Sequence, residues 1–384
     1  MVRVLQVLGT TGLGGAESRV MDLYRHIDRS QIQFDFLVTR GTKKYYENEI
    51  ESLGGHIYYL PPFRIYNYFQ YRKACVSFFE EHKGQYAAVH GHMTSTASIY
   101  LPIAKKSGVP LTIAHARSAG VDPGIKGILT RWLRRRLPDK CDMMLSCSDE
   151  ASVSVFGKAA DRVKFMPNAI DTADFVFDEK VRNDIRSEYN VADRFVIGHV
   201  GSFRYAKNHD LILKVFKEIV ADWNKGSNGK LGIWAEPVLM LLGDGELKPQ
   251  IEDAAREMGI ADRVIFTGNK TPIAPFYHAF DVLLFPSHYE GMPGTVVEAQ
   301  AAGLASLISD KITSQVGITD IVTYMSLDES PETWANKLMD MAKLKIDRNN
   351  VVTLSGELLK DTMYDVNRQA EYYTQLYTGN NTEK

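Results

Sequence analysis

Residues 4–17 read VLQVLGTTGLGGAE, an apolar run that ends in glycines. The run Val4–Leu8 predicts a buried strand, and the pattern after the glycines predicts a helix over about Ala16–Asp28. A buried strand, a glycine turn and a helix are the start of a βαβ unit, whose strands lie parallel. The pattern restarts at the predicted strand Phe195–Val200, which a second glycine turn and a helix over 208–222 follow. We therefore expect two α/β domains in series.

Both halves of the chain alternate short β-branched runs with helical patterns. The other predicted strands are Phe34–Val38, His56–Tyr59, Ala87–His90, Leu111–Ala114, Met143–Cys147, Val163–Met166, Val238–Leu242, Val264–Thr267, Val282–Phe285 and Ala305–Ile308. The polar segment Pro167–Val191 is predicted to connect the domains, and Trp223–Glu236 to form a surface loop. Ser355–Tyr377 has an apolar stripe at helical spacing, and this helix is expected to cap the second sheet or return to the first domain.

The composition of the 384-residue chain excludes several classes of protein. Its 45 Lys and Arg against 47 Asp and Glu give a net charge of −2, whereas non-specific binding to nucleic acid needs a basic excess. The three cysteines form no C-x-x-C pair, so no disulfide framework or zinc site is expected from them. No signal peptide and no membrane span of about 18 apolar residues is predicted. We expect a two-domain intracellular enzyme without a nucleic-acid partner.

The first glycine turn, residues 9–15, lies where a strand meets a helix N-terminus, and backbone N–H groups there favour phosphate. It is not a Walker A loop, because Gly15 and Ala16 stand where that loop has Lys and Ser or Thr. It also lacks the last glycine of G-x-G-x-x-G, where Glu17 stands. A P-loop NTPase and a dehydrogenase are both disfavoured, and a turn that binds no ligand is the simpler alternative.

The second glycine turn begins at Gly201 and carries two cations, Arg204 and Lys207. Arginine binds a phosphate bidentately and lysine binds it as a point charge, so together they can hold a diphosphate. The alternative is a pair of solvated surface charges.

The strongest local feature follows Val282–Phe285 and reads PSHYEGMPGTVVEA over residues 286–299. Its glycines and prolines make a loop of exposed backbone amides, and a helix is predicted to begin near Thr295. Glu290 on the loop and Glu298 on the helix can bracket a ligand, since a carboxylate that accepts two hydroxyl groups is typical of ribose and sugar sites. Two glutamates at this spacing are more often structural, but the loop between them favours a ligand site.

Five motifs, in this order, resemble those of the family 4 glycosyltransferases. They are Gly14-Gly15-Ala16-Glu17, Asn168-Ala169-Ile170-Asp171, Gly201 with Lys207-Asn208, Gly243-Asp244-Gly245, and EGMPGTVVEA from Glu290 to Ala299. The resemblance runs nearly end to end and is closest to the branch that makes capsule, exopolysaccharide and O-antigen chains. It implies a GT-B fold of two Rossmann-like domains facing a cleft. Residues 1–170 would form the acceptor-side domain and residues 171–361 the donor domain, with a C-terminal helix at about 362–384 crossing back to the first.

The resemblance also implies roles for individual residues. Glu290 would lie at the donor sugar, Lys207 at the diphosphate and Glu298 at the nucleotide ribose. The other implied donor-binding positions are Gly14, Gly15, Gly201, Gly243, Asn269, Gly291, Met292, Pro293, Gly294, Thr295 and Val296. The family often has arginine where this chain has Ser202, and Arg204 is the residue implied to supply that guanidinium.

His115 matches the family's histidine beside the donor sugar, although a single histidine at a strand end is otherwise more often structural. His90 and His92 form an H-x-H pair without an evident third ligand, so no zinc site is expected. The chain also has no D-x-D motif. No metal or other cofactor is therefore expected, and cations and helix dipoles would replace a divalent ion.

Residues 126–140 carry six cations against one acid, Asp139. The opposite helical face holds Ile125, Ile128, Leu129, Trp132 and Leu133. A basic amphipathic helix suits anionic lipid headgroups, which would place a cytoplasmic protein at the inner face of the membrane through residues 125–140. The alternative is a helix that packs its apolar face inward and leaves its cations in solvent.

These features predict a retaining, metal-independent hexosyltransferase of surface polysaccharide biosynthesis. It would move a sugar from a nucleotide-diphosphate donor, a UDP-sugar before GDP-mannose, to a hydroxyl of a glycan or lipid-linked glycan acceptor. Same-face attack is favoured because no covalent nucleophile is evident. Two alternatives remain, a nucleotide-sugar epimerase of the same fold and a non-catalytic sugar-binding partner in polysaccharide assembly.

Overall fold

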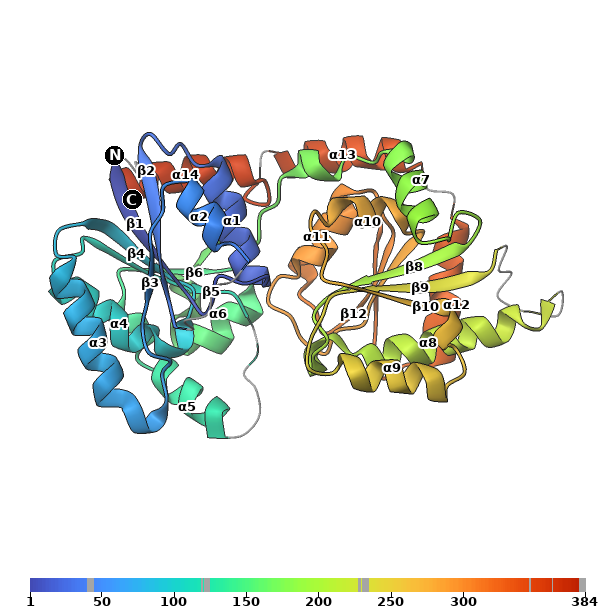
Figure 1. Cartoon of the computed structure of the whole chain (residues 1–384), viewed down its shortest axis with the longest axis horizontal. Helices are drawn as coiled ribbons and strands as arrows, with labels where there is room; N and C mark the ends of the chain where they lie inside the picture. The colour runs from blue at the N-terminus through green and yellow to red at the C-terminus, as the bar shows by residue number, and fades with distance from the viewer. Residues whose placement is uncertain are drawn as a thin grey trace. The chain divides into compact units, whose positions relative to one another are not determined.

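The computed structural model describes residues 1–39, 45–118, 120, 125–226, 229, 235–344, 347–360 and 362–379. The chain divides into two compact units, shown in Figure 1. Unit 1 comprises Met1–Ile170 and Thr362–Lys384, and unit 2 comprises Asp171–Asp361. Each unit is built on its own parallel sheet.

The sheet of unit 1 has the strand order β3-β2-β1-β4-β5-β6-β7, and its neighbouring strands pair in parallel. The strands are β1 (Val2–Leu8), β2 (Ile32–Val38), β3 (Ile57–Tyr59), β4 (Tyr86–Gly91), β5 (Leu111–Ala116), β6 (Met143–Ser146) and β7 (Lys164–Phe165). All seven side chains of β2 are buried. A parallel sheet that helices cover on both faces requires such continuous burial.

Helices cover both faces of this sheet (Figure 1). They are α1 (Gly15–His26), α2 (Glu47–Ser52), α3 (Tyr68–Glu81), α4 (Thr94–Lys106), α5 (Ile125–Arg134), α6 (Asp149–Phe156) and α14 (Val366–Thr378). Helix α14 packs along α1 and on β1, β2 and β4, while α4 packs between α3 and α5 and contacts β4 and β5. Within the described ranges, none of the helices combines the length and the apolar character that a membrane crossing requires.

Helix α14 is held in unit 1 by backbone hydrogen bonds with Ile170, the last residue before the chain passes into unit 2. The Ile170 N–H donates to the Tyr364 carbonyl at 2.9 Å, and the Ile170 carbonyl accepts from the Val366 N–H at 3.0 Å. Asp365 then caps the helix by accepting from the Asn367 and Arg368 N–H groups. The C-terminal helix therefore belongs to the first unit.

Unit 2 has the strand order β10-β9-β8-β11-β12-β13, again parallel throughout. The strands are β8 (Phe195–Val200), β9 (Pro237–Leu242), β10 (Val264–Gly268), β11 (Val282–Phe285), β12 (Ser306–Ser309) and β13 (Val322–Met325). The helices are α7 (Glu179–Glu188), α8 (His209–Trp223), α9 (Lys248–Glu257), α10 (Ala274–Ala279), α11 (Gly294–Ala301), α12 (Pro331–Lys343) and α13 (Arg348–Lys360). Helix α8 packs against α9 and α12, and α11 packs against α10 and α13 (Figure 1). The predicted fold class, two Rossmann-like units with the C-terminal helix in the first, is confirmed.

The segment Pro167–Val191 is more than the polar connection that we predicted, because it contains α7. The buried side of this helix uses arginines instead of apolar residues. Arg182 donates to the His278 carbonyl at 2.8 Å and Arg186 to the Ala279 carbonyl at 2.9 Å, both at the C-terminal end of α10. Both guanidiniums also pair with Asp281. The apolar residues of α7, Val181 and Ile185, are only partly buried. This stripe is too short to predict a helix, which is why the sequence pattern did not reveal it.

The prediction of one helix over Ser355–Tyr377 is also wrong. Helix α13 ends at Lys360 in unit 2, and α14 begins at Val366 in unit 1. The Asp365 cap separates the two helices. The predicted loop Trp223–Glu236 falls in part on residues 227–228 and 230–234, which lie outside the described residues.

His209, the first residue of α8, is a buried imidazole that is held by stacking alone. Its ring lies on Phe203 with centroids 4.1 Å apart, and within the described structure neither ring nitrogen has a hydrogen-bond partner. Burial lowers the pKa of His209 to about 4. The folded state therefore binds fewer protons than the unfolded state below pH 6.5, and stability is lost as the pH falls.

We predict that His209→Phe flattens this pH dependence. When the pH is lowered from 7 to 5, the unfolding free energy of His209→Phe should fall by about 2 kcal/mol less than that of the wild type. The phenyl ring keeps the stack with Phe203 and removes two buried polar atoms, so stability at pH 7 should hold or rise. Urea unfolding at both pH values measures the difference, and equal pH slopes for the two proteins would contradict the assignment.

Candidate active site

Two loops of unit 2 meet at one edge of its sheet. Residues 201–208 follow β8 and residues 286–294 follow β11, and these strands are parallel neighbours. The His288 N–H donates to the Ala206 carbonyl at 2.8 Å, and the Tyr205 ring stacks on the His288 ring with centroids 4.5 Å apart. Backbone and side-chain contacts thus bind the two loops together.

These contacts bring together two of the residues singled out from the sequence. Lys207 Nζ lies 2.8 Å from Glu290 Oε1, and both side chains are about 15% exposed. The ammonium also lies 4.4 Å above the Phe285 ring. A methyl group on Gly201 would stand 3.0 Å from Lys207 Cδ and Cε, so the glycine leaves room for the lysine to cross the loop. The result is an ion pair held at the carboxyl end of the sheet.

Helix α11 begins inside the second loop, at Gly294. Its N-cap residue is Pro293, and no side chain caps the first turn. The Thr295 hydroxyl donates to the Val200 carbonyl at 3.3 Å, which ties the helix start to β8. The first turn of α11 therefore presents backbone N–H groups and a positive dipole end at the same edge as Lys207. Gly291, Met292 and Pro293, which lead into it, are buried.

Glu298 lies one turn further along α11 and is 5% exposed. Its Oε2 accepts a hydrogen bond of 2.6 Å from the Tyr277 hydroxyl on α10. Tyr277 was not evident from the sequence, because it stands 21 residues earlier in a short helix and no local motif connects the two. The tyrosine fixes the orientation of a carboxylate that we expected to bind ribose.

The Gly243-Asp244-Gly245 turn after β9 lies against the first loop, backbone to backbone. The Gly201 N–H donates to the Leu242 carbonyl at 2.9 Å and the Phe203 N–H to the Asp244 carbonyl at 3.0 Å. Gly243 has a φ of +138°, which favours glycine, and its N–H donates to the Gly268 carbonyl at 3.0 Å. Asn269 follows that carbonyl and is exposed. This motif therefore has a packing role beside any role in nucleotide binding.

Arg204 lies on the exposed side of the first loop. Its backbone carbonyl accepts from the Lys207 N–H at 3.0 Å, which shapes the turn. The structure does not bring its guanidinium into contact with Lys207 or Glu290, so its predicted role at the diphosphate stays a prediction.

In unit 1, Gly14 and Gly15 form the start of α1, as predicted. Gly14 is the N-cap residue and has no side chain to cap the helix. A methyl group on Gly14 would collide with the Glu17 carboxylate, whereas Gly15 has open space around it. The first turn of α1 thus already carries the Glu17 carboxylate, which would have to move if Gly14 had a side chain.

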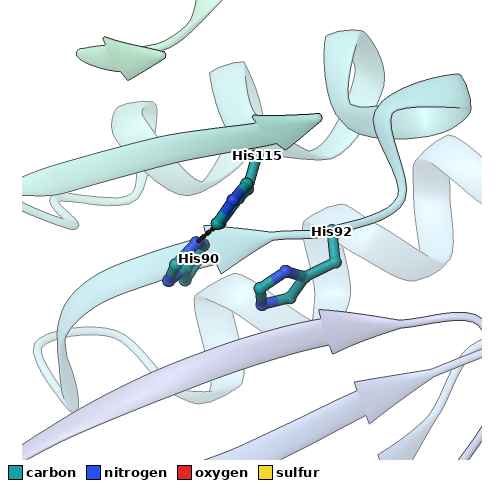
Figure 2. A group of neighbouring side chains, drawn as sticks. All are labelled: His90, His92 and His115. Carbon is teal, nitrogen blue, oxygen red and sulfur yellow. Dashed lines mark hydrogen bonds between the residues drawn. The ribbon is translucent and has the colours of Figure 1, made fainter. Parts of the chain in front are cut away.

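His115, at the end of β5, lies in a buried chain of imidazoles that begins at the C-terminal helix. Figure 2 shows it beside His90 and His92. The Tyr377 hydroxyl lies 2.6 Å from His90 Nδ1, and His90 Nε2 lies 3.0 Å from His115 Nδ1. His115 Nε2 ends the chain at the Met166 carbonyl, 3.4 Å away. His115 has no exposed surface.

The carbonyl at the end of this chain determines where the protons are. Because a carbonyl only accepts, His115 carries its proton on Nε2, so its Nδ1 accepts from His90 Nε2–H and His90 Nδ1 accepts from the Tyr377 hydroxyl. Burial lowers the pKa of His90, His92 and His115 well below the usual range, which keeps them neutral. The chain ties α14 to the sheet, and a direct contact between His115 and a sugar stays a prediction.

Among the described residues, these three imidazoles are the group whose ring nitrogens lie within 4.8 Å of one another, close enough to share a metal ion. The His90 ring is tilted only 25° from the His92 ring and 10° from the His115 ring. The ring nitrogens that would bind an ion are already in hydrogen bonds: His90 Nε2 with His115 Nδ1, and His92 Nε2 with Gln6 Oε1. The geometry favours a hydrogen-bonded chain, while the absence of a metal cofactor stays a prediction.

The fold and the site together define a class. Two Rossmann-like units, a lysine–glutamate pair and a second glutamate on the following helix are typical of a glycosyltransferase of the GT-B type. The family model Glycosyltransferase Family 4 matches residues 13–174, and Glycosyl transferases group 1 matches residues 194–343. The putative glycosyltransferase EpsF of Bacillus subtilis (strain 168) is 33% identical over 344 residues, 88% of this chain and 86% of that protein. The chain belongs to the family 4 glycosyltransferases.

More distant relatives extend over the whole chain. The capsular polysaccharide biosynthesis glycosyltransferase CapH of Staphylococcus aureus is 21% identical, and the match covers 98% of this chain and 99% of that protein. The crystal structure of Anabaena HepE in complex with UDP-glucose aligns with a TM-score of 0.76 at 14% identity, covering 98% of this chain and 100% of that one. WaaG, a glycosyltransferase involved in lipopolysaccharide biosynthesis, aligns with a TM-score of 0.73 at 14% identity, with 98% and 100% covered. These structures show that the fold is GT-B.

The packing role of the second glycine motif can be tested at Gly245. A Cβ there would stand 2.5 Å from the Phe203 carbonyl oxygen and 2.8 Å from its nitrogen, both backbone atoms that cannot move freely. We predict that Gly245→Ala lowers the unfolding free energy of the protein by about 1–3 kcal/mol. Urea unfolding measures the loss.

The matched control is Gly356→Ala in helix α13 of the same unit. A Cβ on Gly356 would meet nothing within 4 Å, so this substitution should leave stability unchanged or raise it by up to about 1 kcal/mol. An equal effect of the two substitutions would contradict the packing role.

Proposed function

We propose that this glycosyltransferase transfers a hexose from a UDP-sugar to a hydroxyl of a glycan or lipid-linked glycan in surface polysaccharide biosynthesis. The observation that carries the proposal is the Lys207–Glu290 pair, held by two loops at the edge where α11 begins. The likeness to CapH, a capsular polysaccharide biosynthesis glycosyltransferase, supports the pathway, and the complex of HepE with UDP-glucose supports the choice of UDP.

In this proposal, unit 2 binds the donor along its two loops. Lys207 leaves Glu290 to hold the diphosphate, together with the N–H groups of Gly294 and Thr295 at the start of α11. The Val296 N–H joins them once it releases the Pro293 carbonyl, to which it donates at 3.1 Å. Glu290, freed from the lysine, accepts from donor-sugar hydroxyls, helped by the backbone N–H groups of Gly291 and Met292. Glu298 binds the ribose, with one oxygen already occupied by Tyr277. Gly201, Gly243 and Asn269 complete the nucleotide pocket, and Gly14 and Gly15 of unit 1 bind the diphosphate.

The proposed chemistry retains the anomeric configuration. The acceptor hydroxyl attacks the anomeric carbon on the face from which the diphosphate departs, and its proton passes to a departing phosphate oxygen. The glycosidic bond forms as the carbon–phosphate-oxygen bond breaks. Lys207, Arg204 and the α11 dipole stabilise the developing negative charge, so no metal is required. His115 is proposed beside the donor sugar.

We also propose a peripheral membrane contact through residues 125–140. Ile128 and Trp132 are one turn apart on α5 and are 61% and 68% exposed. Arg131 and Arg135, beside them, are exposed as well. Leu133, in contrast, is buried, so only part of the predicted apolar face packs inward. Exposed aromatic and aliphatic side chains among cations suit an anionic lipid surface.

A second exposed apolar group supports the same contact. Tyr66 and Phe69, near the start of α3, are 88% and 84% exposed, and Arg72 beside them is exposed too. Tyr66 and Phe69 come after the carboxyl end of β3, and α5 comes after the carboxyl end of β5. The carboxyl ends of parallel strands lie at one edge of a sheet. Both apolar groups therefore belong to the same edge of unit 1.

The role of Lys207 gives the first test. We predict that Lys207→Ala lowers the rate of UDP release from UDP-glucose at least about tenfold, or ~1.4 kcal/mol, because the leaving diphosphate loses its cation. Lys214→Ala on the exposed side of α8 is the control and should leave the rate unchanged. An unaltered single-turnover rate in Lys207→Ala would contradict the role. Formation of an isomer without UDP release would indicate an epimerase, and binding without either product would indicate a sugar-binding partner.

The membrane contact is tested by sedimentation with lipid vesicles. We predict that the protein sediments with vesicles of equal parts phosphatidylglycerol and phosphatidylcholine, and less with phosphatidylcholine alone or at high salt. Replacing Ile128 and Trp132 together by serine should lower the bound fraction several-fold. Val153→Ser on α6, where Val153 is 62% exposed, should not change it. Equal binding of both variants would contradict the proposed surface.

A further inference from the structure

Arg117 is a cation of unit 1 that neither the proposed transfer nor the packing of the unit explains. It follows β5 directly and is partly exposed. Its Nη1 donates to Asn168 Oδ1 at 2.7 Å, and its Nε donates to His92 Nδ1 at 3.4 Å. Both partners are neutral groups, so these bonds orient the guanidinium without balancing its charge.

No acidic side chain of the described residues pairs with Arg117. The charge that acts on it from α1 is a second cation, Arg19, whose own partner is Asp22 at 3.2 Å. Burial lowers the pKa of Arg117, because the surroundings disfavour the charged form. Arginine nevertheless stays protonated in proteins. An unbalanced guanidinium in such a place costs free energy, and the described residues of the unit do not offset that cost.

The guanidinium is also held rigidly by its surroundings. Asn168 and His92 are each 9% exposed, and His92 Nε2 is bonded in turn to Gln6 Oε1 at 2.9 Å. Of the five N–H donors of a guanidinium, these contacts use two. The remaining N–H groups are the second one on Nη1 and both on Nη2. They form a fork of the kind that binds a phosphate bidentately.

The position of this fork is that of a ligand site. Parallel α/β sheets bind ligands beyond the carboxyl ends of their strands, and Arg117 and His92 come directly after β5 and β4 there. Asn168 and Ala169 hold two guanidiniums together, because the Ala169 carbonyl accepts from Arg19 Nη1 at 3.0 Å. Since Arg19 is paired with Asp22, the positive charge at this part of the edge comes from Arg117.

We infer that Arg117 is the anion-binding residue of unit 1 and takes a phosphate group of a substrate. Asn168 and His92 position its guanidinium, and the phosphate supplies the negative charge that the described residues of the unit do not provide. The inference rests on the proposed function for the identity of the substrate, which is either the acceptor, as a glycan linked through phosphate, or the nucleotide-sugar donor.

Calorimetric titration of the full chain tests the inference and separates the two sources. Inorganic pyrophosphate is titrated into the protein saturated with UDP, and UDP is titrated alone, for the wild type, Arg117→Gln and Arg117→Lys. If the phosphate is the acceptor's, Arg117→Gln should weaken pyrophosphate binding at least tenfold and leave UDP binding unchanged. If it is the donor's, Arg117→Gln should weaken UDP binding at least tenfold. Arg117→Lys should lose less in either case, since it keeps the charge without the fork.

Arg162→Gln is the matched control, because Arg162 is an exposed arginine of unit 1 that no proposed site uses, and it should bind both ligands as the wild type does. Melting temperatures of all variants establish that they fold. If Arg117→Gln does not fold, Arg117→Lys is compared with the wild type on its own. The inference is overturned if the folded variants at Arg117 bind both pyrophosphate and UDP within twofold of the wild type. Failure of the proposed function would be separate, because it would show as a wild type that binds no UDP or releases none from UDP-glucose.

Discussion

Parallel strand pairing is the constraint on which the rest of this structure depends. In each unit all strands run in one direction, so every strand-to-helix turn lies at one edge of the sheet. That edge collects residues far apart in the sequence, such as Lys207 after β8 and Glu290 after β11. The same constraint in unit 1 brings His92 beside Arg117. The chemistry of each unit is therefore concentrated where its turns and the first turns of the following helices are, as at the start of α11.

Close packing of the turns is what places the charged groups at this edge. In unit 2 Gly243 and Gly245 let their turn approach the backbone of the loop that begins at Gly201, and this packing supports the loop that carries Lys207. In unit 1 the equivalent support comes from α14, whose Tyr377 starts the chain of imidazoles that ends at Met166. Residues that look like ligand-binding motifs in the sequence thus have a packing function as well, as Gly245 shows.

Much of the fold could be predicted from the sequence, because buried parallel strands are apolar runs and their turns are rich in glycine. Helix α7 could not, since its apolar stripe is short and arginines that bind the carbonyls of α10 anchor it instead. At the site, the motif around Glu290 and Glu298 was visible because its residues are close in sequence. Tyr277 and the pairing of Arg117 with Asn168 were not, because such contacts are made by the tertiary structure and leave no local spacing to read.

The central claim is that the two loops of unit 2 bind a nucleotide sugar. Hydrogen–deuterium exchange of the full chain with and without UDP-glucose tests it most directly, because backbone amides of these loops are the proposed ligands. We expect slower exchange over residues 201–208 and 286–300 when UDP-glucose is bound, with little change in α8 and α12. Binding that leaves both loops unprotected, or that protects unit 1 alone, would contradict the claim.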